Sequence, residues 1–426
     1  MEKINISQLG MTLYKEILPN GLSIYVLPNE KAGNIHTTFS TRFGSFNREF
    51  IPYQKENMTK VPAGIAHFLE HKMFEQENGV DPFTFYEERG TDANANTTFY
   101  KTTYLFTGPN HFKENMTYLL DYVQAPYFTD ENVENEKGII EQEIKMVADS
   151  PYADAVDLAI KNCFSNHPLC DTVLGKIKDI HSITKEDLYD CYNTFYQPSN
   201  MFVVITGKVN PEEAIEIIRK NQDEKQYSQE QIIQKEYSIT SGVLKKEEIL
   251  EKNITIPKLV MAYKIDLDHL KEIDDQTIDW AIEQFLEIKF GITSTFSEKV
   301  KQFDILLEEL EYVTLRVKSQ MIVLFIGDTS KIEELIHQID QELQNKKINE
   351  LDFNSKKKKR IADLVYMSDN IYGFNNYIMA DIIKYQDFDP KLIEKLQKFD
   401  FSDFQKYIDQ LSFEHKTIVK VIPKKA

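Results

Sequence analysis

The chain has 426 residues, a formal net charge of −18 at pH 7 and a hydrophobic content of 42%. This length exceeds what one hydrophobic core organises, so we expect two domains. The acidic balance argues against nucleic acid as a partner, because phosphate backbones select basic surfaces. No apolar run reaches the ~18 residues of a membrane span, and the N-terminus lacks a hydrophobic signal core, so we expect a soluble cytoplasmic protein without a membrane partner.

Residues 13–42 alternate apolar and polar side chains around Asn20-Gly21, which predicts antiparallel strands joined by turns. A polar stretch at 221–235 predicts a linker between domains 1–222 and 236–426. Within the first domain we predict helices at 63–75, 81–89, 111–124, 130–150, 184–194 and 211–219, and strands at 99–107 and 201–207.

In the second domain we predict strands at 247–252, 257–264, 309–316, 320–327 and 416–422, and helices at 273–288, 330–345, 356–366 and 402–411. The order of a strand-rich start, helices and a closing strand occurs in both domains, which predicts a duplicated α+β fold. The basic run at 356–360 predicts a solvated helix face, with a partner-docking patch as the alternative.

The three cysteines, Cys163, Cys170 and Cys191, form no Cys-x-x-Cys pair and are odd in number. We therefore expect ordinary buried or half-buried thiols in a reducing compartment. His167 lies between the first two, but the turn expected at His167-Pro168 makes a metal cluster the weaker interpretation.

Residues 67–71 read His-Phe-Leu-Glu-His, inside a stretch with the pattern of an apolar helix. Positions three and four apart share one face of a helix, so His67 and His71 can bind one ion while Glu70 points at the same space. Two imidazoles and one carboxylate suit Zn²⁺, which in catalytic sites leaves a fourth position for water. Glu70 is then the expected general base.

A third ligand is available at 134–143, within the helix predicted to begin at 129–130. Glu136 and Glu143 lie two turns apart and so share a face, whereas Glu141 falls well round the helix. We therefore predict Glu143 as the third ligand, with one Zn²⁺ per chain. The alternative is a solvated acidic helix face, which is common in a chain this acidic.

These motifs resemble the pitrilysin or M16 metallopeptidase family, whose inverted His-x-x-Glu-His arrangement is that of the inverzincins. The resemblance covers the first half of the chain. It extends to Asn20-Gly21, Gly64-Ile65-Ala66, Phe74, Asn94-Ala95-Asn96-Thr97, Tyr104, His167-Pro168, Gly175 and Ile183. Within the family the chain most resembles the short bacterial M16B-like members, especially peptidase-like proteins associated with modification of elongation factor P.

The resemblance implies two homologous α+β domains, each a mainly antiparallel sheet packed with helices, as in M16 peptidases and LuxS-like metallohydrolases. It places the zinc site in the first domain and no metal ligands in the second. It also implies that Glu136 orients a ligand histidine or tunes the ion, and that the chain forms a homodimer or a heterodimer with a related M16 subunit. Active members use an arginine and a tyrosine of the partner half to bind the substrate carbonyl. Tyr312 and Arg316 are available here, but they lack the family's spacing and are not assigned that role.

A peptide substrate is expected to bind as an added strand along 91–98, where main-chain hydrogen bonds give affinity without demanding sequence. Asn94, Ala95 and Asn96 are the predicted contacts, because small and polar side chains let a second backbone approach closely. The alternative is an ordinary exposed edge strand or loop.

The leading hypothesis is a zinc-dependent metalloendopeptidase that hydrolyses short unfolded peptides. The first alternative is a non-catalytic structural or assembly subunit of an M16-type heterodimer. The complete motif favours the enzyme, whereas the missing carbonyl-binding pair keeps the subunit hypothesis open. A zinc hydrolase acting on something other than peptide is a third hypothesis, because fold and metal do not fix the substrate.

Overall fold

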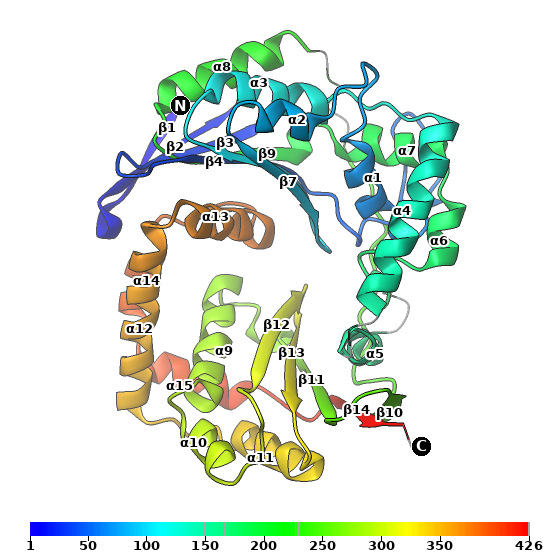
Figure 1. Cartoon of the computed structure of the whole chain (residues 1–426). Coiled ribbons are helices and arrows are strands. Elements are labelled where there is room, and N and C mark those ends of the chain that lie inside the picture. The colour runs from blue at the N-terminus through cyan, green and yellow to red at the C-terminus, as the bar shows by residue number, and fades with distance from the viewer. Residues whose placement is uncertain (149, 151, 165–166, 226, 228–230, 425–426) are drawn as a thin grey trace. The chain divides into compact units, whose positions relative to one another are not determined.

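The computed structural model describes residues 1–148, 150, 152–164, 167–225, 227 and 231–424 (Figure 1). The chain divides into two compact units, and each collects segments from both halves of the sequence. Unit 1 comprises Met1–Ile144, Asp171–Glu236 and Asp363–Ile393, and unit 2 comprises Lys145–Cys170, Tyr237–Ala362 and Glu394–Ala426. One segment of each predicted domain thus belongs to the other unit.

Unit 1 is built on a seven-stranded sheet of order β1-β2-β3-β9-β4-β8-β7 (Figure 1). Neighbouring strands are antiparallel except β3 and β9, which are parallel. β7 pairs with β8 and has no second partner strand in the described part of the chain, so it forms an edge of the sheet. The strands are β1 (Glu2–Ile6), β2 (Met11–Ile17), β3 (Ser23–Pro28), β4 (Ile35–Thr41), β7 (Asp92–Thr97), β8 (Thr102–Gly108) and β9 (Met201–Gly207), with a separate ribbon of β5 (Glu49–Phe50) and β6 (Thr59–Lys60).

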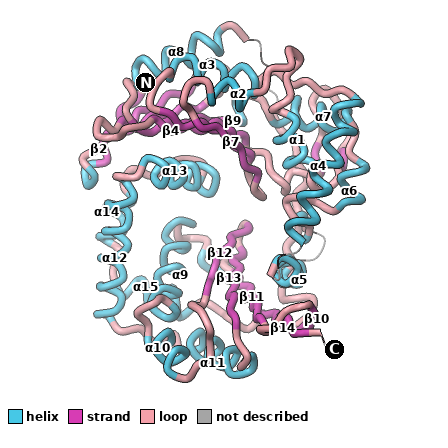
Figure 2. Tube along the Cα trace, viewed as in Figure 1, coloured by secondary structure: helices cyan, strands magenta, loops and turns pink. Residues whose placement is uncertain are grey.

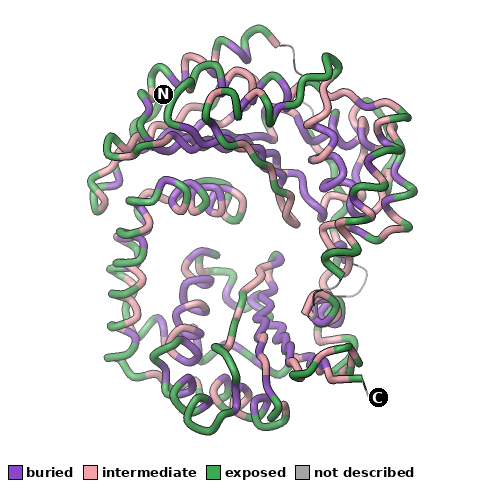
Figure 3. Tube along the Cα trace, in the orientation of Figure 1, coloured by how far each residue is buried: buried purple, intermediate pink, exposed green. Residues whose placement is uncertain are grey.

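Helices cover both faces of this sheet (Figure 2). Side chains alternate between the faces of a strand, so Val203 and Ile205 of β9 pack with α3 and α8, while Phe202 and Val204 pack with α13. Figure 3 shows the sheet as the buried layer between them. The helices are α1 (Ile65–Lys72), α2 (Pro82–Glu87), α3 (Phe112–Val123), α4 (Asp130–Ala148), α6 (Ile177–Ser182), α7 (Lys185–Phe195), α8 (Pro211–Asp223) and α13 (Ile371–Tyr385).

Unit 2 has a five-stranded sheet of order β10-β14-β11-β13-β12, in which only the β10–β14 pairing is parallel. Helices α9, α11 and α15 share a core with one face, and α5 packs against β11 and β14. The strands are β10 (Glu247–Lys252), β11 (Lys258–Asp266), β12 (Glu311–Val317), β13 (Gln320–Asp328) and β14 (Lys416–Pro423). The helices are α5 (Ala153–Cys163), α9 (Asp275–Phe290), α10 (Thr295–Gln302), α11 (Ile332–Gln344), α12 (Glu350–Ser368), α14 (Leu392–Lys398) and α15 (Phe401–Gln410), of which α12 and α14 run across a unit boundary.

The α+β fold class is confirmed, and each predicted element has a counterpart whose ends differ by a few residues. The elements that were not predicted are β1, β5, β6, α5, α6, α10, α13 and α14. The helix predicted to reach 150 ends at Ala148, and residue 149 lies outside the described residues. In the predicted linker, α8 extends to Asp223 and Gln234 forms a β-bridge with Phe50; residues 226 and 228–230 lie outside the described residues.

Two sequence predictions about side chains can be compared with the structure. The three cysteines are free thiols, two of them buried and one half-buried, as expected. The basic run is solvated in part: Lys358 and Lys359 are exposed, whereas Lys356 pairs with Glu287 at 2.9 Å and Arg360 with Glu283 at 2.6 Å. In the described part of the chain, no helix is both long and apolar enough to cross a membrane.

Candidate metal centre

The helix that carries both histidines, α1, begins where two glycines bring two backbone segments together. Gly64 precedes α1 with a φ of +85°, in the left-handed region that favours glycine. A Cβ atom on Gly64 would lie 2.4 Å from the carbonyl oxygen of Leu174, and one on Gly175 would lie 2.5 Å from that of Ala63. This close approach fixes where α1 starts. Seven of the eight residues of α1 are buried.

The structure brings the three predicted zinc ligands together. Nε2 of His67 lies 3.7 Å from Oε1 of Glu143, and Nε2 of His71 lies 3.7 Å from Oε2 of the same carboxylate. One ligand atom from each of the three residues lies within 4.8 Å of the others. Glu141 points elsewhere, because its Oε2 lies 2.8 Å from Nε2 of His181. Helical spacing and structure therefore agree that the carboxylates of Glu141 and Glu143 point in different directions.

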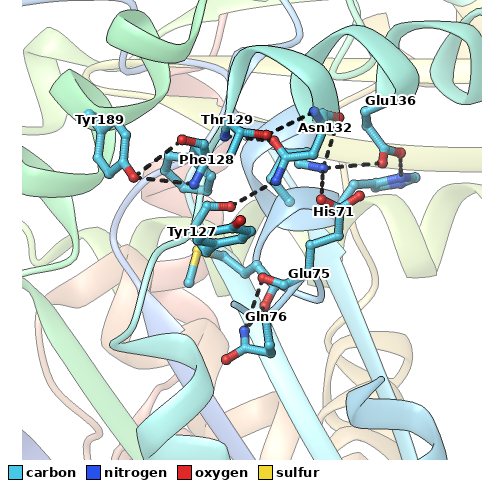
Figure 4. A network of polar contacts seen from close by, with 11 residues as sticks. His71, Glu75, Gln76, Tyr127, Phe128, Thr129, Asn132, Glu136 and Tyr189 are labelled. Carbon is cyan, nitrogen blue, oxygen red and sulfur yellow. Dashed lines mark hydrogen bonds and ion pairs between the residues drawn. The ribbon is translucent and has the colours of Figure 1, made fainter. Parts of the chain in front are cut away.

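Glu136 contacts His71 at the ring nitrogen that does not face Glu143. Its Oε1 lies 2.9 Å from Nδ1 of His71 (Figure 4). An ionised carboxylate can only accept hydrogen bonds, so Nδ1 carries the proton and Nε2 is left for a metal. The buried amine of Lys72, which is not among the predicted site residues, lies 3.9 Å from the other oxygen of Glu136.

Glu70 is buried beside the histidines and is tied to the edge strand. Its Oε2 accepts a hydrogen bond of 2.5 Å from Oγ1 of Thr97, the last residue of β7. Thr97 also contacts Oγ1 of Thr102 on the neighbouring strand β8, at 3.2 Å. The predicted base is therefore oriented by the sheet as well as by its own helix. Thr97 lies in the strand predicted to bind substrate, but its contact with Glu70 was not predicted.

Burial and neighbouring charges set the proton affinities of these groups. Burial, and then the proximity of His71, lowers the pKa of His67 to about 3, which keeps its imidazole neutral. Burial opposes protonation of His71, but the hydrogen bond and charge of Glu136, with the charges of Glu70 and Glu143, raise its pKa overall. Burial also raises the pKa of Glu70 above its ordinary value, although the hydrogen bond from Thr97 acts in the opposite direction.

The donor set fits a zinc ion. Ligand atoms about 2.0–2.1 Å from a tetrahedral zinc are about 3.4 Å from one another, and each histidine nitrogen lies 3.7 Å from the Glu143 carboxylate. Two imidazoles and one carboxylate also form a common three-ligand set of catalytic zinc sites. The buried Nδ1 of His67 has no hydrogen-bond partner among the described residues, so this ring lacks the carboxylate contact that holds His71.

A pocket of about 680 Å³ opens beside Glu70 and His71. Of the predicted substrate contacts, Asn94 and Ala95 line this pocket, whereas Asn96 is not part of its lining. Along β7 exposed residues alternate with half-buried ones, so Ala95 faces the core side and both asparagines face away from it. The three predicted contacts therefore do not share one face of the strand. The pocket's apolar lining comes mainly from Phe74, Val80, Phe83, Ala95 and Ile139.

Tyr312 and Arg316 of β12 are both engaged inside unit 2. The hydroxyl of Tyr312 donates to Oε2 of Glu287 at 2.9 Å. The guanidinium of Arg316 pairs with Asp279 at 2.6 Å and also with Asp275. These contacts give both side chains a structural role in joining β12 to α9.

We expect Glu143→Gln to weaken zinc binding at least about 100-fold, because removal of a ligand should exceed removal of an outer partner, which costs about 10- to 100-fold. Competition with a chromophoric chelator measures this affinity. Glu141→Gln is the matched control, since it makes the same charge change on the same helix but contacts His181. Glu141→Gln should bind zinc like the wild type, and an equal loss in both variants would contradict the assignment of Glu143.

Comparison with known proteins gives consistent matches over the chain. Residues 57–176 match the family profile described as insulinase (peptidase family M16), and residues 182–359 match the M16 inactive domain. A protein of Bacillus subtilis named uncharacterized zinc protease YmfH is 33% identical over 437 residues, which cover 100% of both chains. A mitochondrial-processing peptidase subunit beta of Caenorhabditis elegans is 28% identical over 48% of this chain and 43% of its own length.

Solved structures agree with these matches. The crystal structure of an M16-like peptidase from Alicyclobacillus acidocaldarius superposes with a TM-score of 0.90 and 28% identity, covering 97% of this chain and 99% of that one. A protease from Helicobacter pylori has the same fold, with a TM-score of 0.80 at 19% identity over 96% of this chain and 99% of that chain. With full-length similarity to a zinc protease and two matching domains, the chain belongs to the M16 peptidase family.

Proposed function

We propose that this protein is a zinc-dependent metalloendopeptidase that hydrolyses short unfolded peptides. The observation that carries the proposal is the convergence of His67, His71 and Glu143 beside the buried carboxylate of Glu70. The name zinc protease, given to the full-length relative, supports both the metal and the reaction class. The three converging residues would hold the ion and leave a coordination position for water.

Glu70 is the residue that moves protons in this proposal. A bound zinc ion supplies a water with a pKa near neutrality and polarises the scissile carbonyl. Glu70 accepts the proton of the attacking water and later passes it to the leaving amine. Thr97 keeps the carboxylate in place through both transfers.

The peptide is proposed to bind in extended form along β7. Support comes from the position of β7 at the sheet edge and from Thr97, which joins this strand to Glu70. Main-chain hydrogen bonds to an edge strand give affinity for many sequences, and the pocket lined by Asn94 and Ala95 can take a side chain.

We also propose a dimer, with an identical or a related M16 subunit, in the cytoplasm. A relative named as a beta subunit supports a partner subunit. The three free cysteines support a reducing compartment. The resemblance to proteins associated with modification of elongation factor P leads us to propose such a pathway as the physiological setting.

Cleavage of a mixed pool of unstructured peptides, followed by mass spectrometry, tests the proposed activity. We expect cuts by the zinc-loaded protein, none after chelation, and recovery when zinc is restored, because Glu70 alone does not make water a sufficiently strong nucleophile without the ion. The residues flanking each cut then define the preference. If the zinc-loaded protein cleaves nothing even after copurification with a partner subunit, the non-catalytic subunit hypothesis replaces this one.

A further inference from the structure

Lys72, the residue after the second histidine, has a side chain with 0% exposure. Its amine lies 2.6 Å from Oε2 of Glu75, donates to the carbonyl oxygen of Asn132 at 3.0 Å and lies 3.9 Å from Oε2 of Glu136. Burial of a charged amine is unfavourable unless protein partners replace its water. An apolar side chain of similar length would fill this volume without that cost, so packing alone does not account for a lysine here.

The carbonyl that Lys72 contacts belongs to Asn132, whose own hydrogen bonds fix the start of helix α4. The amide of Asn132 donates to Oγ1 of Thr129 at 3.1 Å, and its Oδ1 accepts from the amide of Thr129 at 2.9 Å (Figure 4). Nδ2 of Asn132 also donates to the carbonyl of Tyr127 at 3.1 Å. Because these contacts cap the helix, the bond from Lys72 ties the end of α1 to a defined point on α4.

The carboxylate of Glu136 links Lys72 to one of the metal ligands. Glu136 lies one turn after Asn132 on α4, with Oε2 toward Lys72 and Oε1 toward Nδ1 of His71. Two zinc ligands come from α1 and the third, Glu143, comes from α4. The distance between these helices therefore decides whether the three ligand atoms can meet at one ion.

We propose that Lys72 is a positioning residue of the metal centre: it clamps α4 to α1 and holds Glu136 against His71, so that the ligand atoms of both helices reach one ion. The inference rests on the proposed function, because it assumes that the site binds zinc. Lys72 is neither one of the three ligand residues nor part of the pocket lining, so its effect passes through Glu136 and the helix.

Lys72→Met is expected to weaken zinc binding about 10-fold, the lower end of the range for outer partners of a metal ligand. Competition with a chromophoric chelator measures the affinity, and the visible absorption of the Co²⁺-substituted protein should change in shape because the ligand arrangement changes. Lys72→Gln carries the same expectation and can still donate to the Asn132 carbonyl. Lys72→Gln replaces Lys72→Met in these measurements if circular dichroism shows that Lys72→Met is unfolded.

A double-variant cycle shows whether the effect passes through Glu136. Glu136→Gln should itself weaken zinc binding, and Lys72→Met added to it should cause little further loss. Glu75→Gln is the control, since it removes the charge of the half-exposed partner of Lys72 and leaves the contacts to α4; it should bind zinc like the wild type.

Each outcome separates this inference from the proposed function. A wild-type protein that binds no zinc overturns both. A wild type that binds zinc and a folded Lys72→Met variant with the same affinity and the same Co²⁺ spectrum overturn the role of Lys72 alone. Equal losses from Lys72→Met and Glu75→Gln, or losses that add fully in the double variant, likewise overturn it.

Discussion

Glu70→Gln is expected to lower kcat/KM for peptide cleavage about 10²- to 10⁴-fold, the range associated with loss of a general acid–base residue. The amide has the shape of the carboxylate but cannot accept the proton of the attacking water. It can still take part in the hydrogen bond to Thr97, so the local structure should remain. Cleavage of a peptide identified from the pool, followed by chromatography, gives the rate.

The zinc content of Glu70→Gln must equal that of the wild type, because loss of metal would give the same loss of rate. Glu77→Gln is a matched control for charge, since Glu77 is exposed and is not part of the pocket lining. It should retain most of the activity. A zinc-loaded Glu70→Gln variant that cleaves at the wild-type rate would show that another group supplies the base.

Gly64→Ala is expected to lower the free energy of unfolding by about 3 kcal/mol, near the upper end for single substitutions. Two effects add at this position. The φ of +85° disfavours a residue with a side chain, and the new Cβ would lie 2.4 Å from the backbone carbonyl oxygen of Leu174, which cannot rotate away. Urea denaturation measures the change, and zinc affinity should fall with it because α1 begins at this glycine.

Two other glycines separate these effects. Gly79 has a φ of +70° and open space where a Cβ atom would lie, so Gly79→Ala should show the backbone penalty alone, about 1–2 kcal/mol. Gly138 lies exposed within α4 with no atom near the position of a Cβ, so Gly138→Ala should stabilise the protein by about 0.5–1 kcal/mol. If Gly64→Ala and Gly79→Ala lower the free energy of unfolding equally, the close approach to the Leu174 carbonyl does not contribute to the loss of stability.

The part of the site that lies on single helices was predictable from sequence. Helical spacing alone places His67 and His71 on one face, and it separates Glu143 from Glu141. The contacts of Thr97 with Glu70 and of Lys72 with Glu136 join different elements, so no local spacing encodes them. The two-residue periodicity of β7 gave one signal for the position of Thr97, because it places Thr97 on the same face of the strand as Ala95.

The fold was predictable where apolar residues repeat regularly and less so where buried polar groups interrupt them. In α13 the apolar positions 371, 374, 378 and 382 have helical spacing, but Asn375 and Asp381 are buried among them. Asn375 is satisfied by backbone and side chains of the sheet, accepting from Thr38 at 2.9 Å and donating to the carbonyl of Val204 at 3.0 Å. Such partners exist only after the chain has folded, so sequence alone does not show that this segment covers the first sheet.

The crossing of α13 into unit 1 has a consequence for synthesis on the ribosome. Domains usually fold from the N-terminus as the chain emerges, but the apolar face formed by Tyr25, Phe202 and Val204 is completed by α13. This face must wait for residues 371–385, long after the rest of its sheet has been made. We therefore expect the nascent first half to expose this apolar face, and a chain cut near residue 230 to aggregate rather than form an independent domain.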